Sequence, residues 1–84
     1  MEENNLKKLR WACRRGMLEL DVLLGNFLKG GYPQLTEVHQ KQFSRLLTFP
    51  DPVLLAWLLG KETPVEAEMA HMVDLIRRHA SHSR

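Results

Sequence analysis

Glycine and proline interrupt this chain so regularly that only short elements can form between them. Gly16, Gly30-Gly31, Pro52, Gly60 and Pro64 separate segments in which apolar residues recur at the three- and four-residue spacing of an α-helix. No segment alternates polar and apolar residues as a half-buried strand does, and no internal repeat is present. The pattern predicts an all-α protein, a compact five-helix bundle in a single domain.

The boundaries of these helices follow from ordinary start and stop signals. Gly16 is expected to end the first helix by adopting positive φ. Asp51 is expected to be the N-cap of the fourth helix, and Thr63 to Glu66 form a capping box that opens the fifth. We expect residues 79–84 to be a frayed tail. The predicted helices cover about residues 5–14, 17–28, 35–47, 51–59 and 63–78, in a domain of residues 1–84 with its core at about 5–78.

Each predicted helix carries an apolar stripe that should face the core. In the second helix, Leu18 and Val22 lie off this stripe, close to the side of Glu19 and Asn26. That helix is therefore either central in the bundle or carries a surface for a partner. The expected core positions are Leu6, Leu9 and Cys13; Met17, Leu20, Leu23, Leu24, Phe27 and Leu28; Leu35, His39, Phe43, Leu46 and Leu47; residues 53–59; and Val65, Met69, Met72, Val73 and Ile76.

Charge and composition limit the classes of function that the chain can have. The chain has 84 residues and a net charge of +2, with 12 basic and 10 acidic residues, which argues against a dedicated nucleic-acid binder. A basic N-terminal run around Trp11 keeps a small nucleic-acid-binding module open as an alternative. No apolar stretch is long enough for membrane insertion. The polar start and the lone Cys13 fit a bacterial cytoplasmic protein.

The sequence offers only weak candidates for a catalytic or a metal-binding site. Cys13 lies on an apolar stripe, so it is better interpreted as a core residue than as a nucleophile. His79 and His82 are three residues apart, but no further ligands accompany them. Gly30-Gly31 follows a helix and does not form a phosphate-binding loop. We expect neither an enzyme nor a tightly bound metal or cofactor.

The segment from Arg14 to Asp21 is the most distinctive part of the chain. It places two cations, a glycine and two carboxylates at the junction of two helices. A glycine without a side chain would let a partner's backbone approach. Alternatively, Gly16 only stops a helix and Glu19 pairs with Arg15 across one turn, worth about 0.2–0.5 kcal/mol. Spacing alone leaves both interpretations open.

Three segments in order carry a resemblance to a known family. WACRRGMLELD, FSRLLTFPDPVLLAWLLGKETP and AEMAHMVDLIRRH resemble the small flavinylation factor family of succinate dehydrogenase, whose bacterial members are called SdhE or YgfY. The similarity runs from about Leu9 to His79. Its RGxxE motif, residues 15–19, is short, but together with the DPxLxxWL-like segment of residues 51–58 it becomes fairly specific.

The resemblance implies a five-helix assembly factor. Members of the family bind the flavoprotein subunit of succinate dehydrogenase, and in bacteria also that of fumarate reductase, and promote covalent attachment of FAD to it. By resemblance, Arg15, Gly16 and Glu19 face the partner, with Arg14 and Asp21 in the same segment. FAD would be attached to the partner, and this chain is expected to be a monomer. Some members carry the name antitoxin CptB, so an antitoxin-like protein that binds a membrane toxin is the main alternative.

Overall fold

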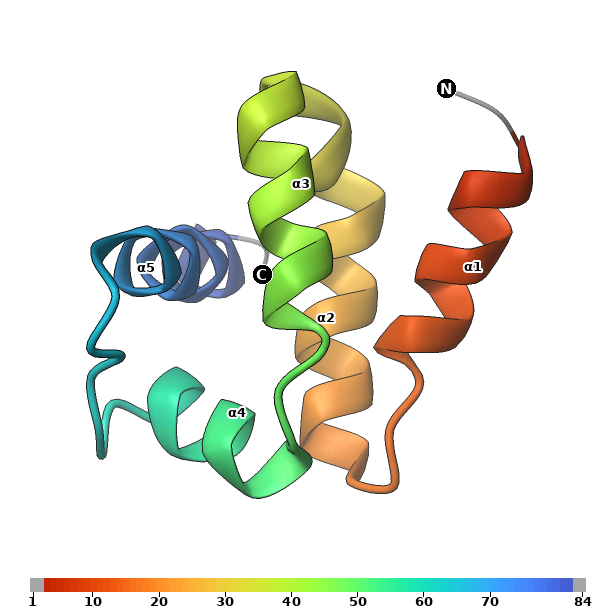
Figure 1. Ribbon diagram of the computed structural model, residues 1–84. Helices are drawn as coiled ribbons and strands as arrows, with labels where there is room; N and C mark the ends of the chain where they lie inside the picture. The colour runs from red at the N-terminus through yellow and green to blue at the C-terminus, as the bar shows by residue number, and fades with distance from the viewer. Residues whose placement is uncertain (1–2, 83–84) are drawn as a thin grey trace.

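Five α-helices and one short 3-10 helix make up the part of the chain that the computed structural model describes, residues 3–82. No strand occurs within those residues. The all-α class and the five-helix architecture predicted from the sequence are therefore confirmed. The elements are α1 (Glu3–Cys13), α2 (Leu18–Gly30), η1 (Tyr32–Gln34), α3 (Glu37–Leu46), α4 (Asp51–Leu58) and α5 (Ala67–His82), as Figure 1 shows.

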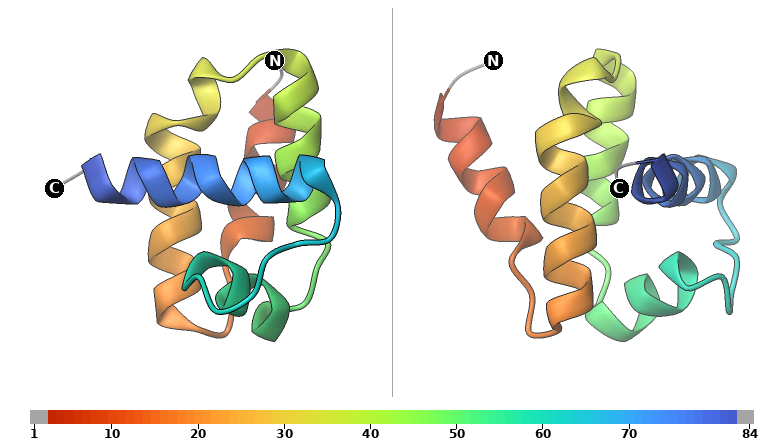
Figure 2. Two further views of the ribbon diagram at one scale, coloured as in Figure 1. Left: turned by 90° about the vertical axis from the view of Figure 1, so that its left-hand side faces the viewer. Right: turned by 180° about the vertical axis from the view of Figure 1, so that it is seen from behind.

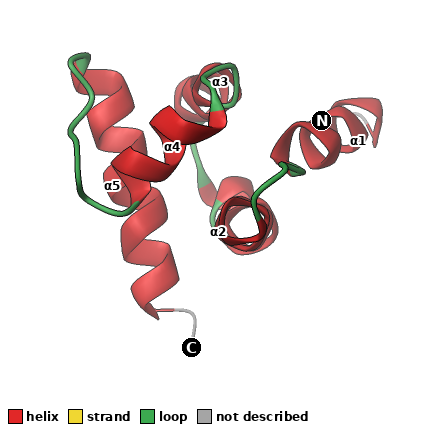
Figure 3. Cartoon of the chain, turned by 90° about the horizontal axis from the view of Figure 1, so that it is seen from below, coloured by secondary structure: helices red, strands yellow, loops and turns green. Residues whose placement is uncertain are grey.

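Helix α2 is the centre of the bundle. It packs against α1, α4, α5 and η1, whereas α3 packs mainly against α5. Helices α2 and α3 stand side by side, and α5 crosses them, which is clearest in the left view of Figure 2. Seen from below, α1 lies on the opposite side of α2 from α5 (Figure 3). Helix α1 is thus an outer element whose packing depends on α2.

Most of the core is made by the stripes that the sequence predicted. Leu59, however, is 50% exposed and His39 is only half-buried, so these two core predictions were wrong. The side chain of Leu6, another expected core residue, lies outside the described part of the chain. Leu20 and Leu24 of α2 and Phe43 of α3 are fully buried, and the Phe27 and Phe43 rings lie 5.3 Å apart. Tyr32 is also buried and stacks obliquely on Phe43, with ring centroids 5.5 Å apart, although its position predicted only a connector. The buried hydrophobic residues are Leu9, Cys13, Leu20, Leu24, Phe27, Leu28, Tyr32, Phe43, Leu46, Leu47, Leu54, Trp57, Leu58, Met69, Met72, Val73 and Ile76.

Helix α4 begins and ends near the expected residues, but Asp51 has a different role. Gly60 has φ of +79°, the left-handed conformation that terminates a helix, as predicted. Pro50 occupies the N-cap position and Asp51 is the first helical residue, with no side-chain cap. The Asp51 carboxylate instead binds Arg15. The N-cap prediction was therefore wrong, because a charged partner from another segment engages the carboxylate.

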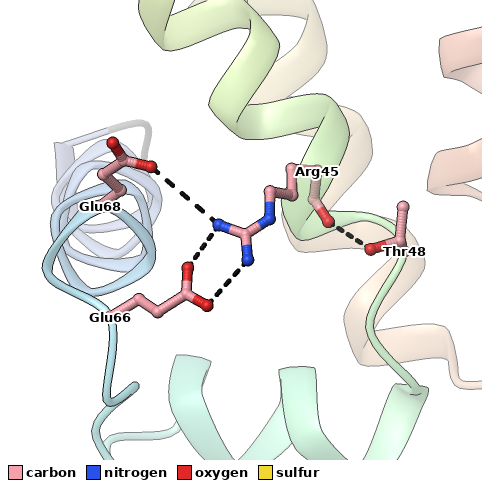
Figure 4. A network of polar contacts seen from close by, with 4 residues as sticks. All are labelled: Arg45, Thr48, Glu66 and Glu68. Carbon is pink, nitrogen blue, oxygen red and sulfur yellow. Dashed lines mark hydrogen bonds and ion pairs between the residues drawn. The ribbon is translucent and has the colours of Figure 1, made fainter.

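The start of α5 also differs from the prediction. The helix begins at Ala67, so Thr63 to Glu66 do not form a capping box, and Val65 is fully exposed instead of lying on the core stripe. Figure 4 shows the cause: Arg45 of α3 forms a two-pronged pair with Glu66, with Nη2 donating to Oε2 at 2.7 Å. Bidentate pairs between arginine and a carboxylate are stronger than neutral hydrogen bonds, and here the Glu66 carboxylate binds Arg45 in place of a backbone N–H at the start of the helix. Both side chains are about half exposed (48% and 49%), so the pair positions the loop more than it stabilises the fold.

The C-terminal part of α5 is ordered further than the sequence predicted. The helix continues to His82, whereas residues from 79 onward were expected to fray; residues 83–84 lie outside the described part. The His79 ring packs edge-on against Phe27, with centroids 5.6 Å apart. It also passes close to Gly30, where an added Cβ would lie 2.8 Å from the ring. His79 is a polar residue, but it packs against the core through its ring.

Candidate functional site

The site predicted from the sequence is the connection between α1 and α2. Arg14 N–H closes α1 by donating to the Trp11 carbonyl at 3.0 Å, and Asp21 N–H opens α2 by donating to the Met17 carbonyl at 3.1 Å. The half-buried Asp21 carboxylate accepts the backbone N–H of Arg15. Asp21 therefore fastens the connection onto the first turn of α2, where a carboxylate is also favoured by the helix dipole.

Arg15 points into the fold. Its side chain is 15% exposed, and its Nη1 donates to the Asp51 carboxylate at 3.2 Å. Its Nη2 donates to the Leu47 carbonyl just after α3. Arg15 therefore ties the α1–α2 connection to the end of α3 and the start of α4. The alternative in which Arg15 pairs with Glu19 is wrong, because sequence spacing shows neighbours on one helix but not a carboxylate brought in from a distant segment.

Gly16 is exposed and does not have positive φ, since Gly60 is the one positive-φ residue among those described. The predicted conformational role of Gly16 as a helix stop is therefore wrong. A Cβ at this position would meet only Asp51 Oδ2, at 4.0 Å, which is an ordinary contact. The fold itself leaves room for a small side chain here.

Glu19 lies on the outer side of α2, between two apolar residues that are also exposed. Leu18 is 75% exposed and Val22 is 50% exposed, so one turn of α2 presents a carboxylate flanked by aliphatic groups. Apolar groups left on a small protein's surface next to a charge are typical of a binding site. Helix α2 is central in the bundle, which confirms the first of the two interpretations, but Leu18 and Val22 are exposed and lie outside its buried face.

Arg14 is exposed, unlike Arg15. Its guanidinium lies 5.6 Å from the centre of the Trp11 ring, and this indole is 73% exposed. The five predicted site residues therefore divide into two groups. Arg15 and Asp21 hold the connection in place, whereas Arg14, Gly16 and Glu19 are exposed on it.

Cys13 borders this site but is not a nucleophile. It is 3% exposed, and burial raises the pKa of its thiol to about 11, more than the nearby Arg15 charge lowers it. A thiol with a raised pKa stays protonated at neutral pH, and the protonated form is a poor nucleophile. Cys13 is therefore a core residue, as its place on the apolar stripe predicted.

The rest of the described structure holds neither a cluster of metal-ligating side chains nor a membrane-spanning helix. Within residues that the structure describes, no three His, Cys, Asp or Glu side chains are placed to hold a metal ion. None of the described helices has the length and apolar character needed to cross a membrane. The His39 and His71 rings meet between α3 and α5 with centroids 5.1 Å apart, a pair that sequence reasoning missed because the two helices are distant in the chain.

Comparison with known proteins gives a consistent match over nearly the whole chain. Residues 7–80 match the family described as flavinator of succinate dehydrogenase. The chain is 46% identical to the FAD assembly factor SdhE of Shewanella oneidensis, over 96% of this chain and 99% of that protein. It is 48% identical to the protein of the same name from Legionella pneumophila strain Paris, over 92% and 96% of the two chains.

A solved structure extends the match to the fold. The solution structure of a UPF0350 protein superposes with a TM-score of 0.78 and 41% sequence identity, covering 96% of this chain and 87% of that one. The five-helix arrangement is therefore shared with a protein of closely similar sequence.

Proposed function

Because this chain belongs to the family of flavinators of succinate dehydrogenase, we propose that it is an FAD assembly factor that acts on a flavoprotein. It binds the flavoprotein subunit of succinate dehydrogenase, and also that of fumarate reductase, in the cytoplasm before the complex assembles. It promotes covalent attachment of FAD to that subunit. The observation that carries this proposal is the family match across residues 7–80, joined to relatives of the same length that bear the name FAD assembly factor.

The chemistry of the chain supports a helper that is not itself a catalyst. The one thiol is buried and protonated. The protein therefore acts by binding its client and favouring one conformation of it, which requires only that the factor bind that conformation more tightly. Holding the flavin and the acceptor histidine in attack geometry lowers the barrier, as in oriented intramolecular reactions. FAD stays with the client, and the free assembly factor does not hold it tightly.

The exposed side of the α1–α2 connection is the surface we assign to the client. Gly16 and Glu19 lie on it together with Leu18 and Val22, and this combination of a carboxylate, a flat glycine and aliphatic groups suits a specific protein contact. Arg15 supports this surface from beneath by fixing the connection to α3 and α4.

The direct test is deletion of the gene. Without the factor, the flavoprotein subunit should lose covalently bound flavin, seen as lost fluorescence of its band in a denaturing gel, and a plasmid with the wild-type gene should restore it. A deletion strain whose flavoprotein is fully flavinylated would contradict the proposal. Isothermal titration of the purified factor with FAD checks the second part, because a low-micromolar complex without the client would show that the factor itself holds the flavin.

A further inference from the structure

A groove runs between α1 and α2 next to the proposed client surface. It has a volume of about 470 Å³ and is open to solvent. Leu28 and Gly25 of α2 form part of its apolar wall, and Arg10, Arg14 and Lys29 line it from both helices. The right view of Figure 2 and the view in Figure 3 show that α1 and α2 run beside each other there.

Gly25, which lines this groove, differs from the two glycines that end α2 and follow it. At Gly30 and Gly31 a Cβ would collide with the rings of His79 and Phe27, so packing inside the protein requires glycine there. At Gly25 a Cβ would meet nothing within 4 Å. Glycine in a helix interior lowers helix stability, and nothing within the described fold accounts for it at this position. An open glycine on a groove floor instead suits the close approach of another backbone.

The charge on the groove is strongly one-sided. Three cations line it against a single carboxylate, that of Asp21, which already accepts the Arg15 backbone N–H. Arg10, Arg14 and Lys29 are exposed, and none of them pairs with an acidic side chain among residues 7–81, whose side chains the structure describes. Cations that lie close together without a neighbouring carboxylate to neutralise them attract a negatively charged ligand and raise its rate of association.

The groove is continuous with the surface assigned to the client. Leu18, Val22, Gly25 and Lys29 follow one another at spacings of four, three and four residues, which places them on one face of α2. On α1, Trp11 lies beside Arg14, so an aromatic ring extends the same region. A ligand in the groove therefore reaches the turn that carries Glu19.

We propose that this groove receives an acidic segment of the client flavoprotein, with its backbone over Gly25 and its carboxylates on Arg10, Arg14 and Lys29. The proposal rests on the proposed function, because that function supplies the client. A protein segment fits better than a nucleic acid, since the groove is partly apolar and the whole chain has a net charge of only +2.

Charge reversal tests the electrostatic part. The double variant Arg10→Glu/Lys29→Glu should weaken binding to the purified flavoprotein subunit, prepared without covalent flavin, by about tenfold or more, and should reduce the salt dependence of the Kd. The matched control is Lys61→Glu, an exposed cation in the loop after α4, which should bind as the wild type does. Equal affinities for the double variant and the wild type would overturn the groove proposal.

Larger side chains at Gly25 test the steric part of the groove proposal without disturbing the fold. Gly25→Ala and Gly25→Gln replace glycine by better helix formers in open space, so both should melt at or above the wild-type temperature. Gly25→Gln should nevertheless weaken client binding by about tenfold. A stable Gly25→Gln protein with wild-type affinity would show that no backbone approaches this helix.

Cross-linking identifies the chemistry of the occupant. A water-soluble carbodiimide joins an amine to a carboxylate in contact with it, so Lys29 should become linked to an aspartate or glutamate of the client subunit. Lys29→Arg keeps the charge and should keep binding but lose this link. A link to the client from Lys61 and none from Lys29 would overturn the groove proposal while leaving the proposed function intact. Wild-type protein that binds no flavoprotein subunit would instead overturn the proposed function and, with it, the identity of the occupant.

Discussion

The two sides of the α1–α2 connection differ in what their residues contact, although they alternate within one short motif. On the inner side, Arg15 is bound by Asp51 and by the Leu47 carbonyl. On the outer side, Gly16 and Glu19 are exposed beside Leu18, whose side chain is 75% exposed. One residue of the motif, Arg15, thus serves the fold, while Gly16 and Glu19 remain available for the proposed contact with the client. Substitutions on the inner side should act through stability, and those on the outer side through the client.

The largest effect on stability is expected in the core beneath the connection's anchor helix α4, at Trp57. Trp57 is 8% exposed and packs against the Phe49 ring at a centroid distance of 4.9 Å. Trp57→Ala should cost roughly 3–5 kcal/mol because it leaves a cavity in a small core. Circular dichroism should show a largely unfolded protein, since this loss approaches the total stability of many small domains. A well-folded variant would mean that the packing of Trp57 contributes little to the stability of the core.

A comparison of Arg15→Ala with Arg14→Ala tests the difference between the inner and the outer side most directly. Loss of the Arg15 guanidinium leaves the half-buried Asp51 carboxylate and the Leu47 carbonyl without their donor, which should cost about 1–3 kcal/mol. Arg14→Ala removes only an exposed contact with Trp11, worth about 0.5 kcal/mol. Urea denaturation gives both values. Equal losses in the two variants would remove the distinction between inner and outer side.

Removal of residues 79–84 should have a smaller effect. Truncation after Arg78 removes the edge-on contact between His79 and Phe27, and such ring contacts are worth about 0.5–1.5 kcal/mol beyond area burial. We expect the melting temperature to fall by a few degrees, with the helical circular dichroism signal otherwise kept. An unchanged melting temperature would mean that the end of α5 contributes nothing, as the sequence alone suggested.

Gly16→Ala should have the smallest effect on stability. Because Gly16 has no positive φ and a Cβ would meet only Asp51 Oδ2 at 4.0 Å, the free energy of unfolding should change by about 0.5 kcal/mol or less. Thermal denaturation measures this directly. A loss above about 1 kcal/mol would indicate the strained backbone that the sequence first predicted for this glycine.

The helices and most of the core could be predicted from the sequence, because both depend on local periodicity. The stripe of α2 is an example, with Leu20, Leu24, Phe27 and Leu28 all buried. Val65 was misassigned because periodicity cannot show that Arg45, from α3, draws Glu66 out of the helix. Several errors thus arise where a side chain meets a partner that is distant in the chain, as Glu66 meets Arg45 and His79 meets Phe27.

The sequence predicted which segment forms the candidate site, but not how the side chains of that segment are arranged. Its residues are contiguous, so their position at a helix junction could be foreseen. Whether Arg15 points inward depends on Asp51, which the chain brings to it only through the path of α3 and α4. Spacing likewise favoured Asp51 as a helix cap, because a carboxylate before a proline is typical of one.

The central claim is that the outer side of the α1–α2 connection binds the client, and flavinylation by folded variants tests it most directly. Purified flavoprotein subunit, FAD and each variant are combined, and covalent flavin is read as fluorescence of the subunit in a denaturing gel. Glu19→Ala and Gly16→Arg should keep the wild-type circular dichroism spectrum but lose most flavin attachment. The control Glu37→Ala removes an exposed carboxylate from the first turn of α3 and should keep full activity. Full flavinylation with folded Glu19→Ala and Gly16→Arg proteins would contradict the claim.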